Sequence, residues 1–523
     1  MTERLLAIRF EAAALRHGSD TAVRDERITL SYTQLLMQAR SVAQDLHACG
    51  LIADETVLVR VSNHPLDFAA FLGVWLAGGV VVPVHRSSPD GVVEAIQAKA
   101  QCGCGIDLDA SGTPRVTAAV WADTTGNGGR PGLRPGLRPI LRGAALVIFT
   151  SGSTGSPKGA VLTHAAFVGK LDENQKLLKL SQHDVTLLVL NNTFSFGIWL
   201  ALVTLFQGGA LVLRSRFTAE DFPDVLAAEG ITRVGVVPTM IRAMFAALSD
   251  TALSAARTRL QTAGCLRDMV TGGEPLGTDL SARLRSFIAP ARLYDIYGLT
   301  ETATSDFVLT PEEYADHPGS IGRVASRVRH RIVNEQGSEV PQGTAGELQL
   351  LTPFVMVGYL GDEALAEAAF DGDWFRTGDL AFADTHGYVS IAGRRKDVMV
   401  RGGNKITPLE VERALASCPG VAAALVVGLP DAVLGQRIHA LLIAAPDVVI
   451  DAELVRHALA ERLERFKHPD VCYLGTELPV GRTGKVDRGQ LQALLTSGAL
   501  SPMPSWSASA GRPPSTHRSG SAE

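Results

Sequence analysis

A run of small and hydroxylated residues that ends in a lysine is the part of this sequence best equipped for chemistry. Residues 149–159 are Phe-Thr-Ser-Gly-Ser-Thr-Gly-Ser-Pro-Lys-Gly and continue an apolar, strand-like run over residues 144–149. Glycines let backbone N–H groups converge, hydroxyls donate hydrogen bonds and Lys158 adds positive charge, so the segment could hold phosphates. A flexible Ser/Gly linker is the plain alternative, but a linker seldom follows a buried strand so directly. The Walker P-loop is excluded, because it requires Ser or Thr after the lysine and Gly159 stands there.

Four segments further along the chain carry groups that could act with this loop. Residues 295–302 place an aromatic ring, a tight turn, a hydroxyl and a carboxylate together, and residues 373–380 place an acid beside a glycine turn. Residues 393–397 (Gly-Arg-Arg-Lys-Asp) and 479–487 (Pro-Val-Gly-Arg-Thr-Gly-Lys-Val-Asp) add cationic side chains. Taken singly, these segments are typical of capped turns, solvated charge clusters and surface loops, so only their occurrence together points to a shared function.

The elements that must position these segments alternate between helical patterns and short β-branched runs. The runs lie at residues 57–61, 80–84, 146–149, 186–190, 210–213 and 234–237. This alternation predicts an α/β architecture with largely parallel sheets. A smaller region follows, with a helix at 408–417, strands at 422–428 and 438–444, and a helix at 451–463. We therefore predict domains over residues 1–393 and 394–497.

Two segments show the composition of loops or tails. Residues 126–139 contain a short Pro-Gly-Leu-Arg repeat that is typical of a surface loop. Residues 498–523 are rich in Ser, Pro and Gly, and we expect them to form a disordered tail.

Composition restricts the class of protein. The 523 residues are 46% hydrophobic and 20% charged, as in ordinary globular proteins, and the net charge of −5 offers no footprint for nucleic acid. The six cysteines complete no zinc pattern. Residues 1–15 predict an amphipathic helix rather than a signal peptide. Residues 68–84 are broken by Gly78-Gly79 and too short to cross a bilayer, so we expect a cytoplasmic protein without a membrane span.

The five motifs, taken in order, resemble those of the adenylate-forming (AMP-binding) superfamily, which contains acyl-CoA synthetases, luciferases and the adenylation domains of peptide synthetases. The likeness extends to about residue 495. It implies a large N-terminal domain of helix-flanked sheets and a small, mobile C-terminal α+β domain. It also implies two reactions, in which ATP and a carboxylic acid form an acyl-adenylate and pyrophosphate, and a thiol then takes the acyl group.

The resemblance implies a role for each motif residue in binding ATP. The β- and γ-phosphates would be held by Thr150, Ser151, Gly152, Ser153, Thr154, Gly155 and Lys158. Glu301 would bind Mg²⁺, and Thr300 would hydrogen-bond the α-phosphate. The adenine would contact Tyr297 and the turn formed by Gly273, Glu274 and Pro275. Asp379 would accept hydrogen bonds from the ribose, with Arg394 assisting.

The same resemblance assigns functions in the C-terminal region. Lys485 would bridge the substrate carboxylate and the α-phosphate, which makes it catalytic together with Thr300 and Glu301. Lys396 would be the hinge about which the small domain rotates after adenylation. That rotation would present Gly402 and Gly403 to the thiol acceptor.

The acid substrate is expected to contact Phe194, Ser195, Phe196 and Gly197, together with Gly272. Amino-acid-activating relatives often have an aspartate where this chain has Gly197, so α-amino acids are not expected because a buried ammonium would lack a partner. Many acyl- and aryl-CoA ligases have a histidine here, and its absence weakens any closer analogy. The aromatic side chains favour an aromatic or medium-chain apolar acid, although Trp199 is as readily explained by core packing.

Coenzyme A is the expected acceptor, since the chain carries no fused carrier domain. A separate acyl-carrier protein is the alternative. An inactive nucleotide-binding relative is a third reading, but all the motif residues are present. A luciferase-like oxygenase would need a special substrate that no sequence feature suggests. Monomer and homodimer both stay open.

Overall fold

The computed structural model describes residues 4–109, 112–118, 138–151, 157–445, 448–481, 485–503 and 506. Contacts within the chain divide it into two compact units. The first comprises Met1–Thr377 and Phe382–Ser390, and the second Gly378–Ala381 and Ile391–Glu523. The predicted domain boundary at 393–394 stays a prediction. Residues 119–137, which hold most of the predicted loop repeat, lie outside the described residues.

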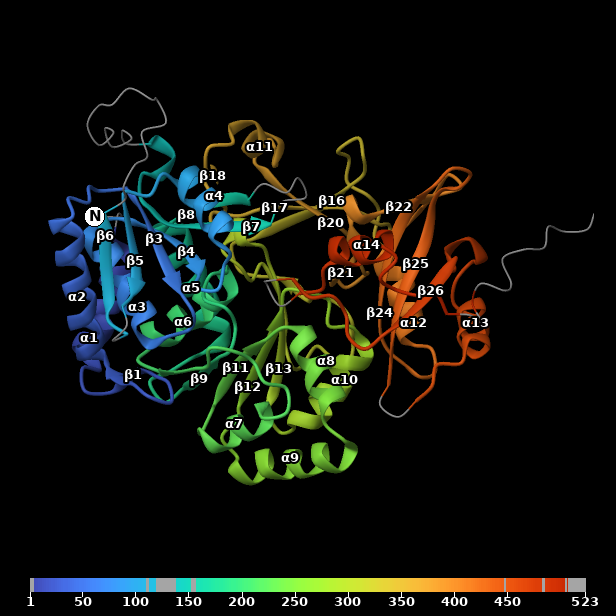
Figure 1. Ribbon diagram of the computed structural model, residues 1–523, viewed down its shortest axis with the longest axis horizontal. Coiled ribbons are helices and arrows are strands. Elements are labelled where there is room, and N and C mark those ends of the chain that lie inside the picture. The colour runs from blue at the N-terminus through green and yellow to red at the C-terminus, as the bar shows by residue number, and fades with distance from the viewer. Residues whose placement is uncertain are drawn as a thin grey trace, which may run out of the picture. The chain divides into compact units, whose positions relative to one another are not determined.

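The first unit is built on two large sheets flanked by helices (Figure 1). In one sheet the neighbouring strands are, in order, β15 (Arg323–Val324), β14 (Phe307–Leu309), β13 (Arg292–Tyr297), β12 (Asp268–Gly272), β11 (Arg233–Val236), β9 (Val185–Leu188), β10 (Ala210–Leu213), β1 (Thr21–Arg24) and β2 (Thr29–Ser31). The strands from β13 to β1 are parallel, as the alternation with helices predicted.

The second sheet carries the phosphate-loop candidate. Its strands run in the order β18 (Gly358–Tyr359), β8 (Pro157–Thr163), β7 (Ala144–Ser151), β4 (Val80–His85), β3 (Thr56–Val61), β5 (Cys104–Leu108) and β6 (Pro114–Ala118). Strands β3, β4, β5 and β7 are parallel, and their Val-rich runs are buried because helices cover a parallel sheet on both faces. The apolar stretch over 68–84 forms the end of α3 (Pro65–Ala77) and then β4, so it belongs to the core as predicted.

Helices pack between and over these sheets. The helices of the first unit are α1 (Leu5–Arg16), α2 (Tyr32–Ala48), α3, α4 (Asp90–Ala100), α5 (His164–Leu178), α6 (Ser195–Phe206), α7 (Phe222–Ala228), α8 (Pro238–Ala247), α9 (Asp250–Ala263), α10 (Thr278–Ile288) and α11 (Glu363–Ala368). Ser31 and Gln34 form a capping box that fixes the start of α2. No helix among the described residues combines the length and apolar character needed to cross a bilayer.

A smaller sheet joins β16 (Arg329–Val333), β17 (Gly346–Leu351), β20 (Trp374–Ala383) and β19 (Phe370–Asp371), and β21 (Val389–Arg394) pairs with β20. The second unit has its own sheet, in which β23 (Asn404–Ile406), β22 (Met399–Arg401), β25 (Gly435–Ala444) and β24 (Val421–Asp431) are neighbours and β26 (Val471–Gly475) pairs with β25.

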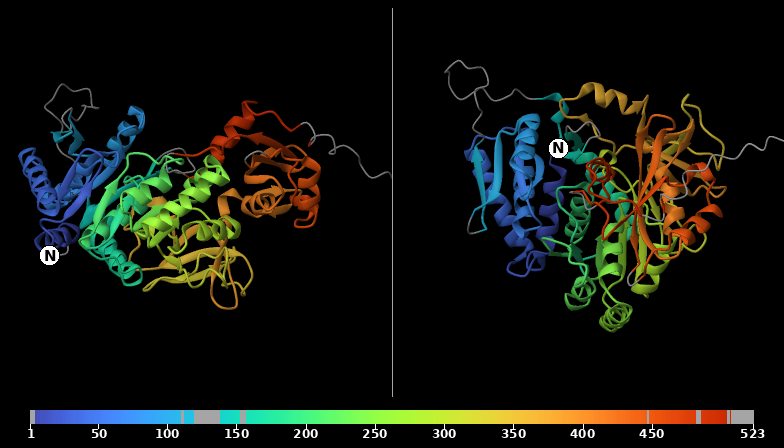
Figure 2. Two further views of the ribbon diagram at one scale, coloured as in Figure 1. Left: turned by 90° about the horizontal axis from the view of Figure 1, so that it is seen from below. Right: turned by 45° about the vertical axis from the view of Figure 1, so that its right-hand side comes forward.

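The sheet of the second unit is buried on both faces. Val426, Ala440 and Leu442 face one apolar cluster with α12 (Pro408–Ala416) and α13 (Ala452–Ala460). Leu425 and Leu441 face the other cluster, with α14 (Arg488–Thr496). Successive strand residues point to opposite faces, so this alternation places helices on both sides (Figure 2).

The prediction of a disordered tail over residues 498–523 is wrong for its first residues. Met503 and Trp506 are buried in the core of the second unit, where the Trp506 indole donates to the Pro469 carbonyl at 3.1 Å and the Arg456 guanidinium lies over its ring. The prediction used the composition of residues 498–523 as a whole, in which two apolar side chains among many Ser, Pro and Gly residues carry little weight. Residues 507–523 lie outside the described residues, and the expectation of disorder there stays a prediction.

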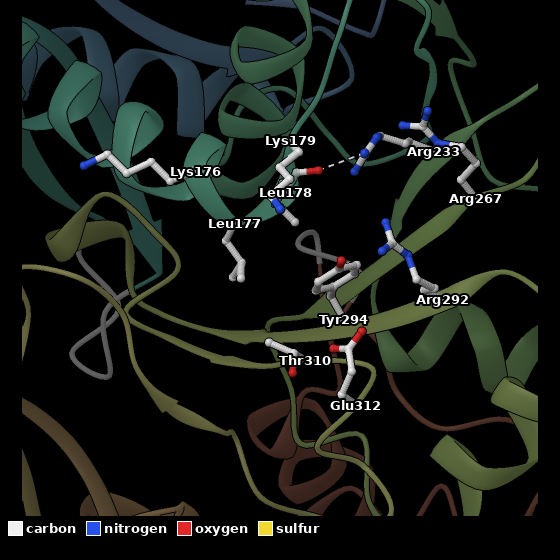
Figure 3. Close-up of a pocket in the computed structure, with 10 residues that line it drawn as sticks. All are labelled: Lys176, Leu177, Leu178, Lys179, Arg233, Arg267, Arg292, Tyr294, Thr310 and Glu312. Atoms are coloured by element: carbon white, nitrogen blue, oxygen red, sulfur yellow. Dashed lines mark hydrogen bonds between the residues drawn. The ribbon is translucent and has the colours of Figure 1, made fainter.

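A hollow of about 580 Å³ lies where β11, β12 and β13 begin (Figure 3). There the buried Arg233 pairs with Asp184 at 2.9 Å and Asp268 at 2.8 Å. Arg267 and Arg292 share these two aspartates from the solvent side. These ion pairs connect the amino-terminal ends of β9, β11, β12 and β13. The hollow contains none of the predicted site residues.

Candidate active site

The lysine-containing motif forms the end of a β-hairpin. Thr150 lies opposite Lys158 in the register of β7 and β8, so the connecting loop is shorter than the predicted 150–159 segment. Gly152, Ser153, Thr154 and Gly155 lie outside the described residues, as does the Ser151 side chain. A side chain at Gly159 would place its Cβ 2.9 Å from the Phe149 ring, so any larger residue would have to displace that ring.

The Tyr297–Asp306 loop doubles back on itself at the carboxyl end of β13. A Cβ at Gly298 would lie 2.2 Å from the Ser305 nitrogen, so the turn requires glycine. The next three residues after the short helix Thr300–Thr302 have φ of +56°, +69° and +59°, a left-handed run that is rare outside glycine. Strain of this kind persists only where surrounding structure enforces it, and it gathers at functional sites.

A buried ion pair enforces this backbone. The Lys170 ammonium on α5 donates to Asp306 at 2.6 Å, and both side chains are almost fully inaccessible to solvent. Thr302 donates to the second carboxylate oxygen of Asp306, and the Asp306 N–H donates to the Tyr297 carbonyl at 2.6 Å. Burial raises the pKa of Asp306 and lowers the pKa of Lys170, while their mutual attraction opposes both shifts. Sequence reasoning missed Lys170, since one lysine in a helix gives no motif signal.

The surroundings of Glu301 fit a magnesium site completed by a nucleotide. The Tyr359 hydroxyl donates to one carboxylate oxygen of Glu301 at 2.8 Å. Among the described residues, no group of three or more His, Cys, Asp or Glu could hold a metal by itself. Mg²⁺ is commonly held by one or two carboxylates together with phosphate oxygens and water, so a single carboxylate beside the hairpin predicted to bind phosphates suits it.

The predicted adenine-binding residues come together at the carboxyl ends of neighbouring parallel strands. Gly272, the last residue of β12, lies opposite Ile296 of β13, which brings the turn after Gly272 beside Tyr297. A Cβ at Gly272 would lie 2.6 Å from the Ile296 carbonyl oxygen, and Gly273 has a φ of +89°. Of the rest of the turn, Glu274 forms an ion pair with Arg242 at 3.3 Å and Pro275 follows it.

The predicted acyl-pocket residues lie at the start of α6, next to Thr300. The Ser195 hydroxyl is 3.2 Å from that of Thr300 and accepts a hydrogen bond from Thr304 at 2.9 Å. Phe194 and Phe196 are partly exposed. Trp199 is fully buried and its indole donates to Asn174 at 2.9 Å, so it is a core residue.

Gly197 has a local structural cause. A Cβ at this position would lie 2.5 Å from the Asn191 carbonyl oxygen, so this backbone accepts no side chain there. The glycine therefore follows from close packing at the start of α6. The absence of an aspartate at 197 therefore has a cause in the local fold.

The remaining predicted residues belong to the second unit. Asp379 is buried and pairs with the half-exposed Arg394 at 2.9 Å. Lys396 is exposed in the short helix Arg395–Asp397. Gly402 and Gly403 form the β22–β23 turn with φ of +55° and +83°.

Lys485 stands at the base of another hairpin in that unit. Its carbonyl accepts from the Gly481 N–H at 2.8 Å, and Val480 bridges to Val486. Residues 482–484 between them lie outside the described residues. The hairpin base thus fixes the backbone of Lys485 within its unit.

The buried carboxyl group of Asp295 should make the thermal stability of the protein depend on pH. Burial on β13 raises the pKa of this carboxyl well above its usual range. A carboxyl with a raised folded-state pKa contributes stability below the unfolded pKa of about 4, and this stability is lost as pH rises through the folded pKa. We expect Asp295→Asn to lose less thermal stability than the unsubstituted protein between about pH 5 and about pH 8. Equal losses, measured by calorimetry, would contradict this origin.

Comparison with known proteins shows the family and the fold of this chain. The AMP-binding enzyme family model matches residues 10–360, and the AMP-binding enzyme C-terminal domain matches residues 410–485. Feruloyl-CoA synthase of Amycolatopsis sp. is 31% identical, with 90% of this chain and 95% of the relative covered. A fatty acid–[acyl-carrier-protein] ligase, ScoC of Streptomyces coeruleorubidus, is 29% identical, with 90% and 92% covered. ATP-bound MatB from Rhodopseudomonas palustris has a TM-score of 0.77 at 26% identity, over 94% of this chain and 99% of MatB.

The chain therefore belongs to the AMP-binding enzyme family, and its fold is that of adenylate-forming enzymes. Within that family it is an acid–thiol ligase.

Proposed function

We propose that this protein uses ATP and Mg²⁺ to join a carboxylic acid to coenzyme A by way of an acyl-adenylate. The observation that carries this proposal is the convergence of three groups in the first unit. The Lys158 hairpin, the Glu301 carboxylate and the linked hydroxyls of Thr300 and Ser195 belong to segments that contact one another directly. The family membership and the CoA-ligase relatives support the same reaction.

In the first step, a carboxylate oxygen of the acid attacks the α-phosphorus of ATP, and the bond from that phosphorus to pyrophosphate breaks. The Lys158 hairpin would hold the β- and γ-phosphates, and Thr300 would donate to the α-phosphate. Magnesium, held through Glu301, would neutralise charge on the leaving pyrophosphate. Lys485 would stabilise the charge that develops between the acid and the α-phosphate.

In the second step, a thiol sulfur attacks the acyl carbonyl carbon, and AMP leaves with the oxygen that joined it to the acyl group. We propose that Lys396 is the hinge that exchanges Lys485 for the Gly402–Gly403 turn between the steps. The exposure of Lys396 and the absence of any side chain at the turn suit these roles.

The acid is proposed to be aromatic or a medium-chain apolar compound. Phe194 and Phe196 offer partly exposed aromatic surface beside the Thr300 hydroxyl network. Feruloyl-CoA synthase, the 31% identical relative, is named for an aromatic acid. A carrier-protein thiol is the second candidate acceptor. It is supported by the similarity of this chain to the acyl-carrier-protein ligase ScoC.

A substrate panel tests this function. The protein is incubated with ATP, Mg²⁺, aromatic and aliphatic acids, and either CoA or a phosphopantetheinylated carrier protein. We expect pyrophosphate and an acyl-CoA thioester with at least one acid. If acyl-adenylate accumulates in the presence of CoA and is consumed only when the carrier protein is added, the carrier protein rather than CoA is the acceptor.

The hinge proposal predicts a selective defect in the second step. Proline at position 396 fixes φ and restricts Arg395 before it, so Lys396→Pro should hinder backbone rotation. We expect pyrophosphate release to continue while thioester formation falls by about tenfold or more. Lys396→Ala, which removes the same side chain but leaves the backbone free, is the control and should retain both steps. Equal losses of both steps in the proline variant would contradict a hinge at this residue.

A further inference from the structure

A short strap links β8, the second strand of the Lys158 hairpin, to the loop that carries Glu301. We define this strap as residues 356–360. At one end the Met356 N–H donates to the Glu301 carbonyl at 2.7 Å. At the other end the Leu360 N–H donates to the Gly159 carbonyl at 2.8 Å, one residue after Lys158. The strap therefore connects two segments to which the proposed function gives phosphate and metal roles.

Tyr359 is the strap residue whose side chain reaches into this region. Its backbone lies opposite Ala160 in the β18–β8 pairing, and its hydroxyl donates to the Glu301 carboxylate at 2.8 Å. The Lys158 ammonium is 5.9 Å from the centre of its ring.

We propose that Tyr359 is a positioning residue that orients the Glu301 carboxylate toward the magnesium of bound MgATP. This inference rests on the metal-binding role proposed for Glu301. The hydroxyl engages one carboxylate oxygen, which fixes the plane of the group and leaves the other oxygen available to the cation. Hydrogen bonds of this kind behind a metal ligand orient the ligand and raise its affinity for the metal.

A role limited to holding the strap in place would have different consequences. The strap is already fixed by backbone hydrogen bonds at Met356, Val357 and Leu360, none of which uses the Tyr359 hydroxyl. Loss of that hydroxyl should therefore leave the strap in place and change only the freedom of the carboxylate. Tyr359→Phe makes this change while keeping the buried ring.

The chain offers a matched control in Tyr388. This tyrosine is buried to the same degree as Tyr359, and its hydroxyl likewise donates to a glutamate carboxylate, that of Glu313, at 2.8 Å. Tyr388→Phe therefore removes the same kind of hydrogen bond without touching Glu301. Any general cost of losing a buried hydroxyl should therefore appear in both variants.

The test compares equilibrium binding of MgATP with that of ATP in EDTA, measured by calorimetry on the full chain. We expect Tyr359→Phe to weaken MgATP binding by about three- to tenfold and to leave metal-free ATP binding unchanged. Tyr388→Phe should change neither. Unchanged or tighter MgATP binding by Tyr359→Phe, or equal weakening of both ATP forms, would overturn the inference.

A double variant separates failure of this inference from failure of the function on which it rests. If Tyr359 acts through Glu301, adding Tyr359→Phe to Glu301→Gln should cause no further loss of MgATP affinity. Additive losses would overturn the inference while leaving the role of Glu301 intact. If Glu301→Gln alone keeps the full preference for MgATP over metal-free ATP, the proposed role of Glu301 itself is wrong, and the inference falls with it.

Discussion

Lys485→Ala is expected to lower the rate of acyl-adenylate formation by about 10²–10³, which corresponds to about 3–4 kcal/mol of lost transition-state stabilisation. The reason is that a fixed ammonium aimed at developing charge needs no rearrangement during the reaction. The hairpin base formed by Gly481, Val480 and Val486 holds the backbone of this lysine within the second unit. Pyrophosphate release with saturating ATP and acid measures the effect.

The same variant supplies its own control through the second half-reaction. Because Lys485 is proposed to act only in adenylation, the variant should convert a supplied acyl-adenylate to thioester at close to the normal rate. A comparable loss in both half-reactions would contradict this division of labour. Retained binding of MgATP would show that the loss arises in the chemical step rather than in folding.

Lys170→Ala is expected to lower the free energy of unfolding by about 3–5 kcal/mol, since it leaves the Asp306 carboxyl buried without its partner. Asp306 also accepts a hydrogen bond from the Thr302 hydroxyl, and its N–H donates to the Tyr297 carbonyl. The substitution should therefore also destabilise the loop that carries Thr300 and Glu301. Urea denaturation followed by intrinsic fluorescence measures the change.

The matched control is Lys176→Ala on the same helix. Lys176 pairs with Glu173 at 2.8 Å, but its side chain is 68% exposed, whereas that of Lys170 is 1% exposed. Because the Lys176 end of this pair lies in water, we expect its loss to cost about 1 kcal/mol or less. Similar small decreases in the free energy of unfolding of the two variants would contradict a major contribution of the buried pair to stability.

The sequence predicted the elements of the fold well where their signal was local. The β-branched runs at 57–61 and 80–84 became β3 and β4, and the helix predicted at 408–417 became α12. Such elements are readable because a few neighbouring residues set both the conformation and the buried face. The motif order also predicted the family that the comparison shows.

What the sequence could not predict depends on contacts between distant segments. Lys170 meets Asp306 across 136 positions, and Tyr359 meets Glu301 across 58. Neither side chain stands in a recognisable pattern, so only the folded chain brings it to the site. Gly197 shows the converse case, in which a residue first considered for substrate selection is required by a backbone contact with Asn191.

The most direct test of the central claim follows an oxygen atom. A carboxylic acid that the enzyme accepts is labelled with ¹⁸O in its carboxylate and incubated with ATP, Mg²⁺ and CoA, and the products are examined by mass spectrometry. Attack of the carboxylate on the α-phosphorus predicts AMP that carries one labelled oxygen, together with unlabelled pyrophosphate. Label in inorganic phosphate accompanied by ADP would mean that the acid attacks the γ-phosphorus, and would contradict the adenylate mechanism.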